Sequence, residues 1–373
     1  MSNVYFVTAR AKGHKSLIEK LGDLMDAVGL DFIPRDGLVA VKLHMGESGT
    51  TAFLKPVFAR KAVEKIAAAG GKPFLTDATT LYLGERGNAV DYLRLGIANG
   101  FSYATVGAPI IIADGLRSEN VTEVRVDLKH FQTVKLASAA RQADALVVLS
   151  HFKGHLASGF GGAIKNVAMG LGSRSQKQRM HGDVKPKLRK GNHCIACGRC
   201  VDICPADAIR VEKVARFDHD RCIGCAECIT ICPEGAIQIL WNESTDRLQE
   251  KMAETMFGIL KGKKDRVAYF NFLLDITPDC DCFPWSDTAV VPDIGILGST
   301  DPIAIDQASM DLINRSPGIP GSALPGALEP GEDKIKALYP AIDWTRQLAY
   351  GEEIGLGSRK YELIELGEET ETS

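Results

Sequence analysis

The chain reads Cys194-Ile-Ala-Cys197-Gly-Arg-Cys200-Val-Asp-Ile-Cys204-Pro205 and, 28 positions later, Cys222-Ile-Gly-Cys225-Ala-Glu-Cys228-Ile-Thr-Ile-Cys232-Pro233. Each copy has the spacing C-x2-C-x2-C-x3-C-P. This is the run of thiolate ligands that bacterial proteins use to hold two [4Fe-4S] clusters. The spacing therefore predicts that the central part of the chain folds around iron and inorganic sulfide.

The same spacing predicts which cysteines share a cluster. Three closely spaced cysteines on one loop can bind three irons of a cluster, and the fourth cysteine of that run binds the other cluster. A proline after each fourth cysteine suits the first turn of a short helix, where a missing N–H costs nothing. We expect a small, ferredoxin-like α+β unit with one cluster on Cys194, Cys197, Cys200 and Cys232 and one on Cys222, Cys225, Cys228 and Cys204. Ile195, Ile203, Ile223 and Ile231 are predicted to form an apolar cover around the clusters.

Zinc binding and disulfide bonding are the alternatives for so many cysteines. Zinc sites usually take four ligands in two paired spacings, whereas this repeat contains eight cysteines. The chain begins Met-Ser-Asn-Val-Tyr-Phe, without a basic and then apolar leader. We therefore expect a cytoplasmic protein, in which cysteines serve metal or redox chemistry instead of disulfides. Exposed clusters would be sensitive to oxygen, which indicates an anaerobic or reducing host.

Composition limits the remaining function classes. The chain has 373 residues, of which 45% are hydrophobic and 24% charged, as in a globular protein of about two domains. A formal net charge of −3 gives no sign of nucleic-acid binding. No apolar run approaches the ~18 residues of a membrane span, so we expect no membrane partner.

Apolar periodicity outside the cysteine repeat predicts alternating strands and helices. Strands are predicted at 4–7, 39–43, 72–76, 110–112, 121–126, 145–149, 267–274, 289–291 and 295–297, and helices at 16–28, 56–69, 88–99, 136–143, 244–260 and 302–314. This alternation favours an α/β fold with a mostly parallel, doubly wound sheet. Because the alternation resumes after the repeat, we predict an α/β domain in two parts, 1–185 and 241–373, interrupted by a ferredoxin domain at 186–240. The acidic tail from Glu365 is expected to fray.

Polar residues follow the predicted strands. Ligands bind outside the carboxyl ends of strands in open parallel sheets, so these side chains should gather at one edge. Catalytic use is predicted for His44, Asp77, His151 and His155, with Glu47 and Lys153 nearby. Hydrogen-bonded loop histidines are the alternative. Cys280 and Cys282 are predicted to bind an additional transition metal or to act as thiols, and buried inert cysteines are the alternative.

Two further stretches suggest anion binding. Gly161, Gly162 and Lys165 precede or begin a predicted helix, whose N–H groups could hold an anion, although the glycines could equally serve close packing. A basic run before the repeat comprises Arg174, Lys177, Arg179, Lys185, Lys187, Arg189 and Lys190. Such runs are usually solvated. The sharper alternatives are docking of an acidic redox partner protein and binding of a small anionic substrate.

Several strings together resemble one protein family. They are Val41-Lys-Leu-His44-Met-Gly46-Glu47, Thr76-Asp77-Ala-Thr, Lys153-Gly-His155, Gly161-Gly-Ala-Ile-Lys165-Asn166 and Gly298-Ser-Thr-Asp301-Pro302-Ile-Ala-Ile-Asp306. With the cysteine repeat, the chain resembles the DUF362 family of iron–sulfur proteins over nearly its whole length. The resemblance implies an α/β domain that carries an inserted two-cluster ferredoxin module.

The sequence thus predicts an electron-transfer protein with two [4Fe-4S] clusters, which passes electrons to a partner protein or to a second site in the α/β domain. An iron–sulfur oxidoreductase and a factor that matures a metal or cofactor are the alternatives. Both would use the strand-end residues. The sequence specifies no substrate, electron donor or oligomeric state.

Overall fold

A computed structural model describes residues 1–11, 15–82, 84–182, 186–191, 193–238 and 243–367. Its centre is an eight-stranded sheet in the order β16-β1-β15-β14-β7-β2-β3-β4. The strands are β1 (Ser2–Thr8), β2 (Leu38–Lys42), β3 (Lys72–Asp77), β4 (Ile110–Ile112), β7 (Ala145–His151), β14 (Val267–Leu273), β15 (Gly295–Ser299) and β16 (Tyr361–Glu365). Neighbouring strands are parallel except where β15 pairs with β1 and β14. The predicted α/β fold with a mostly parallel sheet is confirmed.

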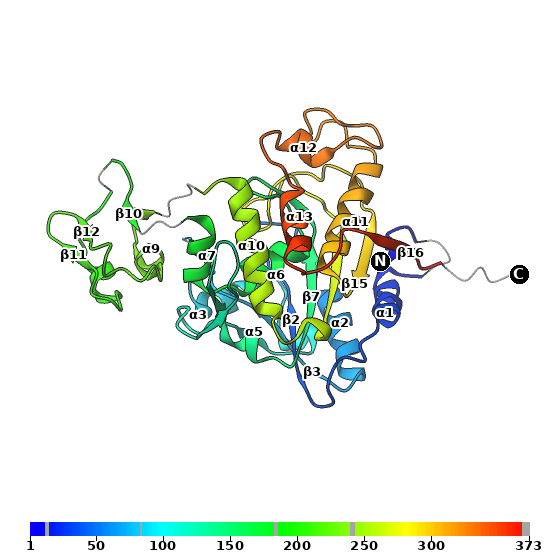
Figure 1. Ribbon diagram of the computed structural model, residues 1–373, viewed down its shortest axis with the longest axis horizontal. Coiled ribbons are helices and arrows are strands. Elements are labelled where there is room, and N and C mark those ends of the chain that lie inside the picture. Colours follow the sequence, from blue (N-terminus) through cyan, green and yellow to red (C-terminus); the bar gives the residue numbers. More distant parts are fainter. Residues whose placement is uncertain (12–14, 83, 183–185, 192, 239–242, 368–373) are drawn as a thin grey trace, which may run out of the picture.

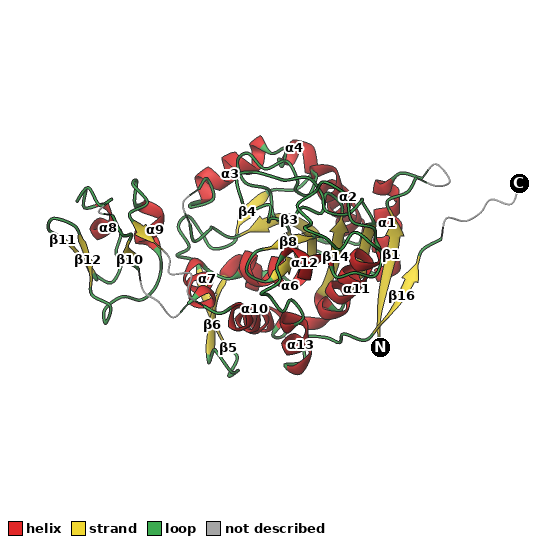
Figure 2. Ribbon diagram, turned by 90° about the horizontal axis from the view of Figure 1, so that it is seen from above, coloured by secondary structure: helices red, strands yellow, loops and turns green. Residues whose placement is uncertain are grey.

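Helices cover both faces of this sheet (Figure 2). One face carries α1 (Leu17–Val28), α2 (Pro56–Ala68), α3 (Ala89–Ala98) and α4 (Tyr103–Val106), and the other carries α6 (Ala163–Leu171), α10 (Thr245–Leu260), α11 (Pro302–Arg315) and α13 (Arg346–Glu353). Each layer buries its own apolar core against the sheet. Amphipathic periodicity explains the arrangement: α1 begins at a Ser16–Glu19 capping box and buries Leu21, Leu24 and Met25.

The order of the strands creates a crevice in the middle of the sheet. From β2 the chain moves outward through β3 to β4, and it then returns to place β7 on the other side of β2. From β7 it continues to β14 in the opposite direction. The helix after β2 covers one face and the helix after β7 covers the other, so a crevice forms between these connections at the carboxyl ends of the two strands. This is the position where open α/β sheets bind ligands.

Three predicted elements differ from the structure. The strand predicted at 121–126 lies outside the main sheet, as β5 (Val121–Arg125) paired with β6 (Thr133–Ala137). Because β6 takes up Leu136 and Ala137, the helix predicted from 136 begins later, as α5 (Ser138–Gln142). Residues 289–291 form no strand, although Val290 is buried and its N–H donates to the Ile276 carbonyl.

The predicted fraying of the tail is also wrong at its first residue. Glu365 ends β16, which pairs in parallel with β1. Residues 368–373 lie outside the described residues. In the part of the chain that the structure describes, no helix has both the length and the apolar character needed to cross a membrane.

The cysteine repeat folds as a lobe at one end of the molecule (Figure 1). This cysteine-rich lobe comprises residues 186–191 and 193–238. It contains β10 (Lys187–Leu188) paired with β13 (Ile237–Gln238), β11 (Ile209–Val211) paired with β12 (Ala215–Phe217), and the short helices α8 (Arg199–Asp202) and α9 (Glu227–Ile231). In the chain it lies between α7 (Arg174–His181) and α10, so elements of the α/β body precede and follow it.

Candidate functional site

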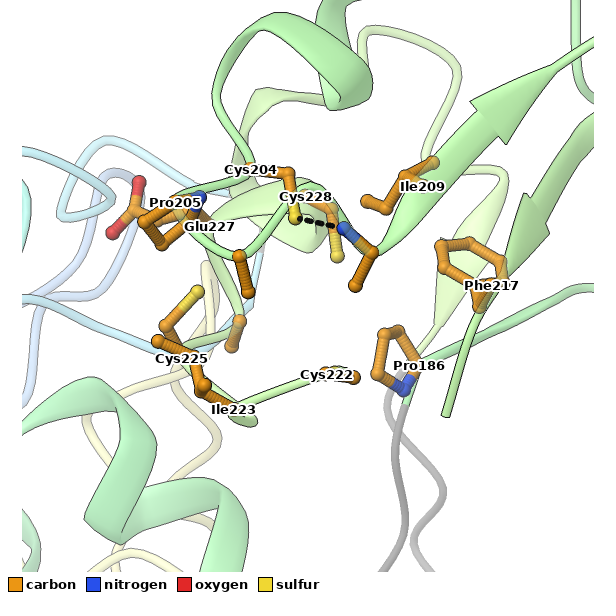
Figure 3. A pocket seen from close by; sticks show the side chains of 13 residues that line it. Pro186, Cys204, Pro205, Ile209, Phe217, Cys222, Ile223, Cys225, Glu227 and Cys228 are labelled. Carbon is orange, nitrogen blue, oxygen red and sulfur yellow. Dashed lines mark hydrogen bonds between the residues drawn. The ribbon is translucent and has the colours of Figure 1, made fainter. Parts of the chain in front are cut away.

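Two hollows lie in the cysteine-rich lobe, and four of the repeat cysteines border each one. Cys222, Cys225 and Cys228 border the inner hollow together with Cys204 (Figure 3). The outer hollow is bordered by Cys194, Cys197, Cys200 and Cys232. The fourth cysteine of each run therefore lies with the first three cysteines of the other run.

The backbone explains why both halves of the repeat present their cysteines alike. Left-handed residues recur at matching positions 28 residues apart, in the pairs Ala196 and Gly224, Gly198 and Ala226, and Asp207 and Gly235. Each three-cysteine loop thus takes the same turns, which direct its side chains toward one hollow. The fourth cysteines also match, since the N–H groups of Ala208 and Ala236 each donate to a cysteine sulfur at 3.3 Å, in Cys204 and Cys232 respectively.

The donor set of each hollow fits a cluster of several irons. Burial raises the pKa of the Cys228 thiol, and the neighbouring cysteines act in the same direction, so a thiolate there needs a positive partner. Among the described residues, no three His, Cys, Asp or Glu side chains converge to hold a single metal ion. A [4Fe-4S] cluster requires no such convergence, because each thiolate binds a separate iron.

The apolar surroundings of the hollows match the predicted cover only in part. Ile195 and Ile223 border the outer and inner hollows but are 61% and 56% exposed, while Ile231 is partly buried against the apolar cluster of the lobe. The lobe instead buries Ile209, Ile229 and Ile237 around Cys200 and Cys228. Leu81, from the α/β body, is part of the same apolar cluster.

A second and larger cavity lies at the carboxyl ends of β2 and β3. Its volume is about 1850 Å³, including its open mouth. Most of the predicted strand-end residues line it, namely His44, Asp77, His155, Gly161, Gly162, Lys165, Cys280 and Cys282, together with Glu47 and Lys153. His151 is the predicted residue that the structure does not place on this strand-end cavity.

Asp77 is tied into a buried network. Its carboxylate lies 3.2 Å from the Lys42 ammonium and accepts a hydrogen bond of 2.5 Å from the Tyr92 hydroxyl. Burial alone would raise the pKa of Asp77, but the positive charges of Lys42 and Lys177 oppose burial, and the pKa is lowered. Asp77 is therefore a fixed negative charge that holds Lys42 at the cavity wall, and it is a poor general base.

The His44 ring lies close to two charged side chains, Arg86 and Asp281. Arg86 donates to its Nε2 at 2.6 Å and also forms an ion pair with Glu47 at 2.8 Å. Burial lowers the pKa of His44 to about 3; the Arg86 charge acts in the same direction, while Asp281 opposes it. His44 is thus neutral near pH 7, and its Nε2 lone pair is occupied by Arg86.

Asp281, in the loop after β14, contacts the last residue of β7 and the first residue of β8 (Lys153–His155). Its carboxylate lies 3.3 Å from His151 Nδ1 and 3.0 Å from the Lys153 ammonium. Burial raises the pKa of Asp281, but the Lys153 charge and the His151 hydrogen bond more than offset this effect, so Asp281 remains ionised. His151 also contacts the Leu274 carbonyl at 3.0 Å through Nε2. These contacts give His151 a structural role, because they hold the loop after β14 against the end of β7.

One ring nitrogen of His155 is hydrogen-bonded to the backbone. Its Nδ1 accepts from the backbone N–H groups of Ala157 and Ser158, each at 3.2 Å. Burial and the nearby Lys165 charge lower its pKa well below the ordinary value. His155 is therefore a neutral residue of the cavity wall that can carry its proton on Nε2.

Cys280 and Cys282 form a pair at the cavity wall. The Cys282 N–H donates to the Cys280 sulfur at 3.4 Å. The Lys165 ammonium lies 3.1 Å from it. Burial raises the pKa of Cys280, but the Cys282 hydrogen bond and the Lys165 charge outweigh burial and lower it. The geometry favours a Cys280 thiolate beside a Cys282 thiol.

The N-terminus of α6 already has an anionic partner. The N–H groups of Ala163 and Ile164 donate to the Asp306 carboxylate at 2.7 and 3.0 Å. A Cβ atom at Gly162 would lie 2.3 Å from Asp306, so glycine permits this close approach. These two N–H groups are consequently not available to an external anion, and the packing alternative explains Gly162. Lys165 points to Cys280 instead.

The first part of the basic run is buried rather than solvated. Arg174 is fully buried and forms an ion pair with Glu227 of α9 in the lobe. Lys177 is 7% exposed and donates to the carbonyl groups of Thr79 and Gly172. The exposed members are Lys187, Arg189 and Lys190, while Lys185 lies outside the described residues.

Some cavity residues were not predicted from the sequence. Arg86 contacts His44 and Glu47, and the Tyr82 hydroxyl donates to the Cys282 carbonyl at 3.3 Å. Both residues lie in the Tyr82 turn, defined as residues 79–82 and 84–87. A loop has no apolar periodicity, so the sequence offered no signal for either. Asp281 lies between the two cysteines in the sequence, and the structure buries it and pairs it with Lys153.

Comparison with known proteins identifies a family match. Residues 39–311 match the family described as "Domain of unknown function (DUF362)". No curated protein matches the chain significantly. Two solved structures resemble it: the lactate racemase apoprotein from Thermoanaerobacterium thermosaccharolyticum, at 14% identity with a TM-score of 0.34, and a structural-genomics protein from Thermotoga maritima, at 12% and 0.36. The matches cover 74% and 69% of this chain, which spans about half of those proteins, 51% and 50%.

Proposed function

The chain belongs to the DUF362 family, and we propose that it is an iron–sulfur electron-transfer protein with two [4Fe-4S] clusters in a ferredoxin domain at 186–240. The observation that carries this proposal is the grouping of the eight repeat cysteines into two hollows of four. Three cysteines of one run and the fourth of the other border each hollow, as interlocked cluster ligation requires.

The residues around the hollows have roles consistent with this proposal. When bound, the clusters supply reversible one-electron chemistry at a potential set by their surroundings. The N–H groups of Ala208 and Ala236 direct positive ends of dipoles at the ligating sulfurs, which stabilises the thiolates. The buried isoleucines limit water. We place the protein in a reducing cytoplasm, where electrons pass to a partner protein or to the strand-end cavity.

A second candidate function is a redox enzyme that acts in the strand-end cavity. The specific observation is that the Cys280–Lys165 contact lies in the wall of a cavity large enough for a small molecule. A transition metal handed over from Cys280 and Cys282 would make the protein a maturation factor instead. Metal analysis separates both candidates from simple electron transfer, because an added transition metal favours either of them, whereas iron alone favours electron transfer.

Two matched serine variants test the interlocked clusters. Cys204→Ser should disturb the cluster whose other ligands are Cys222, Cys225 and Cys228, although Cys204 belongs to the first run. Cys232→Ser should disturb the other cluster. Low-temperature EPR of air-free, reduced samples can assign the loss, with double variants of each three-cysteine loop as references. If Cys204→Ser instead removes the signal that depends on Cys194 and Cys197, the interlocked assignment is wrong.

A further inference from the structure

The inner hollow and the strand-end cavity lie on two sides of the same short segment. Leu81, in the Tyr82 turn, is 2% exposed. It belongs to the apolar cluster of the lobe together with Cys228 and Ile229, and it also lines the strand-end cavity. Leu81 is therefore common to the apolar cluster that contains Cys228 and to the wall of the strand-end cavity.

Tyr82 extends this contact to the second cysteine pair. Its ring packs against the apolar cluster of the lobe, and its hydroxyl donates to the Cys282 carbonyl at 3.3 Å. Arg86 donates to the Tyr82 hydroxyl at 2.6 Å and to the same carbonyl at 3.4 Å. The turn thus touches the lobe on one side and the Cys282 backbone on the other.

A buried arginine fixes the turn against the lobe. Arg174 donates to the carbonyl groups of Thr80 and Gly87, at the two ends of the turn, and forms an ion pair with Glu227. Glu227 lies between Cys225 and Cys228 in sequence, and Figure 3 shows its side chain turned away from the inner hollow. The inner hollow therefore has a fixed position relative to the cavity.

We infer that Cys280 and Cys282 are a redox-active dithiol that exchanges electrons with the cluster of the inner hollow across the Tyr82 turn, an inference that rests on the proposed function. The two cysteines are one residue apart and both line the strand-end cavity, and the Cys282 N–H donates to the Cys280 sulfur at 3.4 Å, so the pair is placed for oxidation to an S–S bond. In the reducing direction this bond breaks, and the pair takes up two electrons and one proton to give a Cys280 thiolate and a Cys282 thiol.

The two clusters together can supply the number of electrons that reduction of one disulfide requires. Two clusters that each carry one electron hold the two electrons that one disulfide requires. A low-potential one-electron donor refills them. The Lys165 ammonium, at 3.1 Å from the Cys280 sulfur, stabilises the thiolate that reduction produces, and the open cavity admits solvent for the proton that Cys282 takes up.

A reductive titration of the full chain tests this inference. Air-free protein is oxidised with glutathione disulfide and desalted, and its iron and sulfide are counted. Intact mass then confirms an internal disulfide by the loss of two hydrogens. Titration with reduced methyl viologen should consume about four electron equivalents per wild-type chain, and about two in a Cys280→Ser/Cys282→Ser variant. N-ethylmaleimide labelling of Cys280 and Cys282 should appear only after the titration.

The proposed electron path, from the cluster of the inner hollow to Cys280 and Cys282, is tested by comparing two cluster variants. Cys204→Ser disturbs the cluster of the inner hollow and should slow reduction of the pair by a larger factor than Cys232→Ser. The inference is overturned if wild type and the double-serine variant consume equal equivalents, if no internal disulfide forms, or if the two cluster variants slow reduction equally. A sample that binds no iron and sulfide would overturn the proposed function itself, which is a separate result.

Discussion

Replacement of Arg174 by methionine should detach the cysteine-rich lobe from the α/β body and destabilise the protein. Arg174 is fully buried and donates to the carbonyl groups of Thr80 and Arg117 at 3.0 and 3.3 Å. It also donates to the carbonyl of Gly87 and forms an ion pair with Glu227. Methionine keeps much of the side-chain volume but provides no donor.

The size of the effect follows from these contacts. Breaking a buried ion pair by removal of one partner typically costs ~3–5 kcal/mol, since the other charge stays buried and unpaired. The Glu227 side chain is 13% exposed, so water can compensate only partly. We expect Arg174→Met to lower the free energy of unfolding by about 3–4 kcal/mol and Glu227→Gln by about 1–2 kcal/mol. The double variant should reveal a coupling of about 1–3 kcal/mol.

Urea unfolding of the air-free protein, followed by circular dichroism, measures the free energy of unfolding of wild type, both single variants and the double variant. Arg216→Met is the matched control, because Arg216 lies in the same lobe but its side chain is 74% exposed, and its change should stay within about 0.5 kcal/mol. A coupling near zero, with Arg174→Met no more destabilising than Arg216→Met, would refute the claim that this ion pair fixes the lobe.

Two further predictions concern Lys165 and Asp306. Lys165→Met removes the ammonium beside Cys280, so the pKa of that thiol should rise and its alkylation by iodoacetamide near pH 7 should slow roughly tenfold, an effect absent in Lys187→Met. Burial raises the pKa of Asp306 from 3.8 to about 6 despite its hydrogen bonds. Between those values the folded chain binds a proton that the unfolded chain has lost, so this group's contribution to stability falls as pH rises, by up to about 3 kcal/mol. The stability advantage of wild type over Asp306→Asn should therefore shrink between about pH 4 and 6 in urea titrations, and a constant difference would contradict the assignment.

Sequence patterns predicted those features that depend on local periodicity. The capping box at Ser16 and the apolar stripe of α1 identify that helix without tertiary information. The short apolar runs of β2 and β3, each bounded by polar residues, identify buried strands. The order in which helices and strands alternate was then sufficient to place most strand-end residues at one cavity.

Features that depend on contacts between distant segments could not be predicted. The Asp306 carboxylate reaches the N-terminus of α6 from α11, so a helix end that looks open in the sequence is satisfied in the fold. Arg174 reads as part of a solvated basic run, although partners from three other segments bury it. β16 was missed because its pairing partner, β1, lies at the opposite end of the chain.

The most direct test of the central claim is the amount of iron and acid-labile sulfide bound by protein purified without air. Eight cysteines arranged as two interlocked sets of four predict about eight irons and eight sulfides per chain, together with EPR signals of two interacting reduced clusters. Protein that instead contains zinc and no labile sulfide would contradict the account.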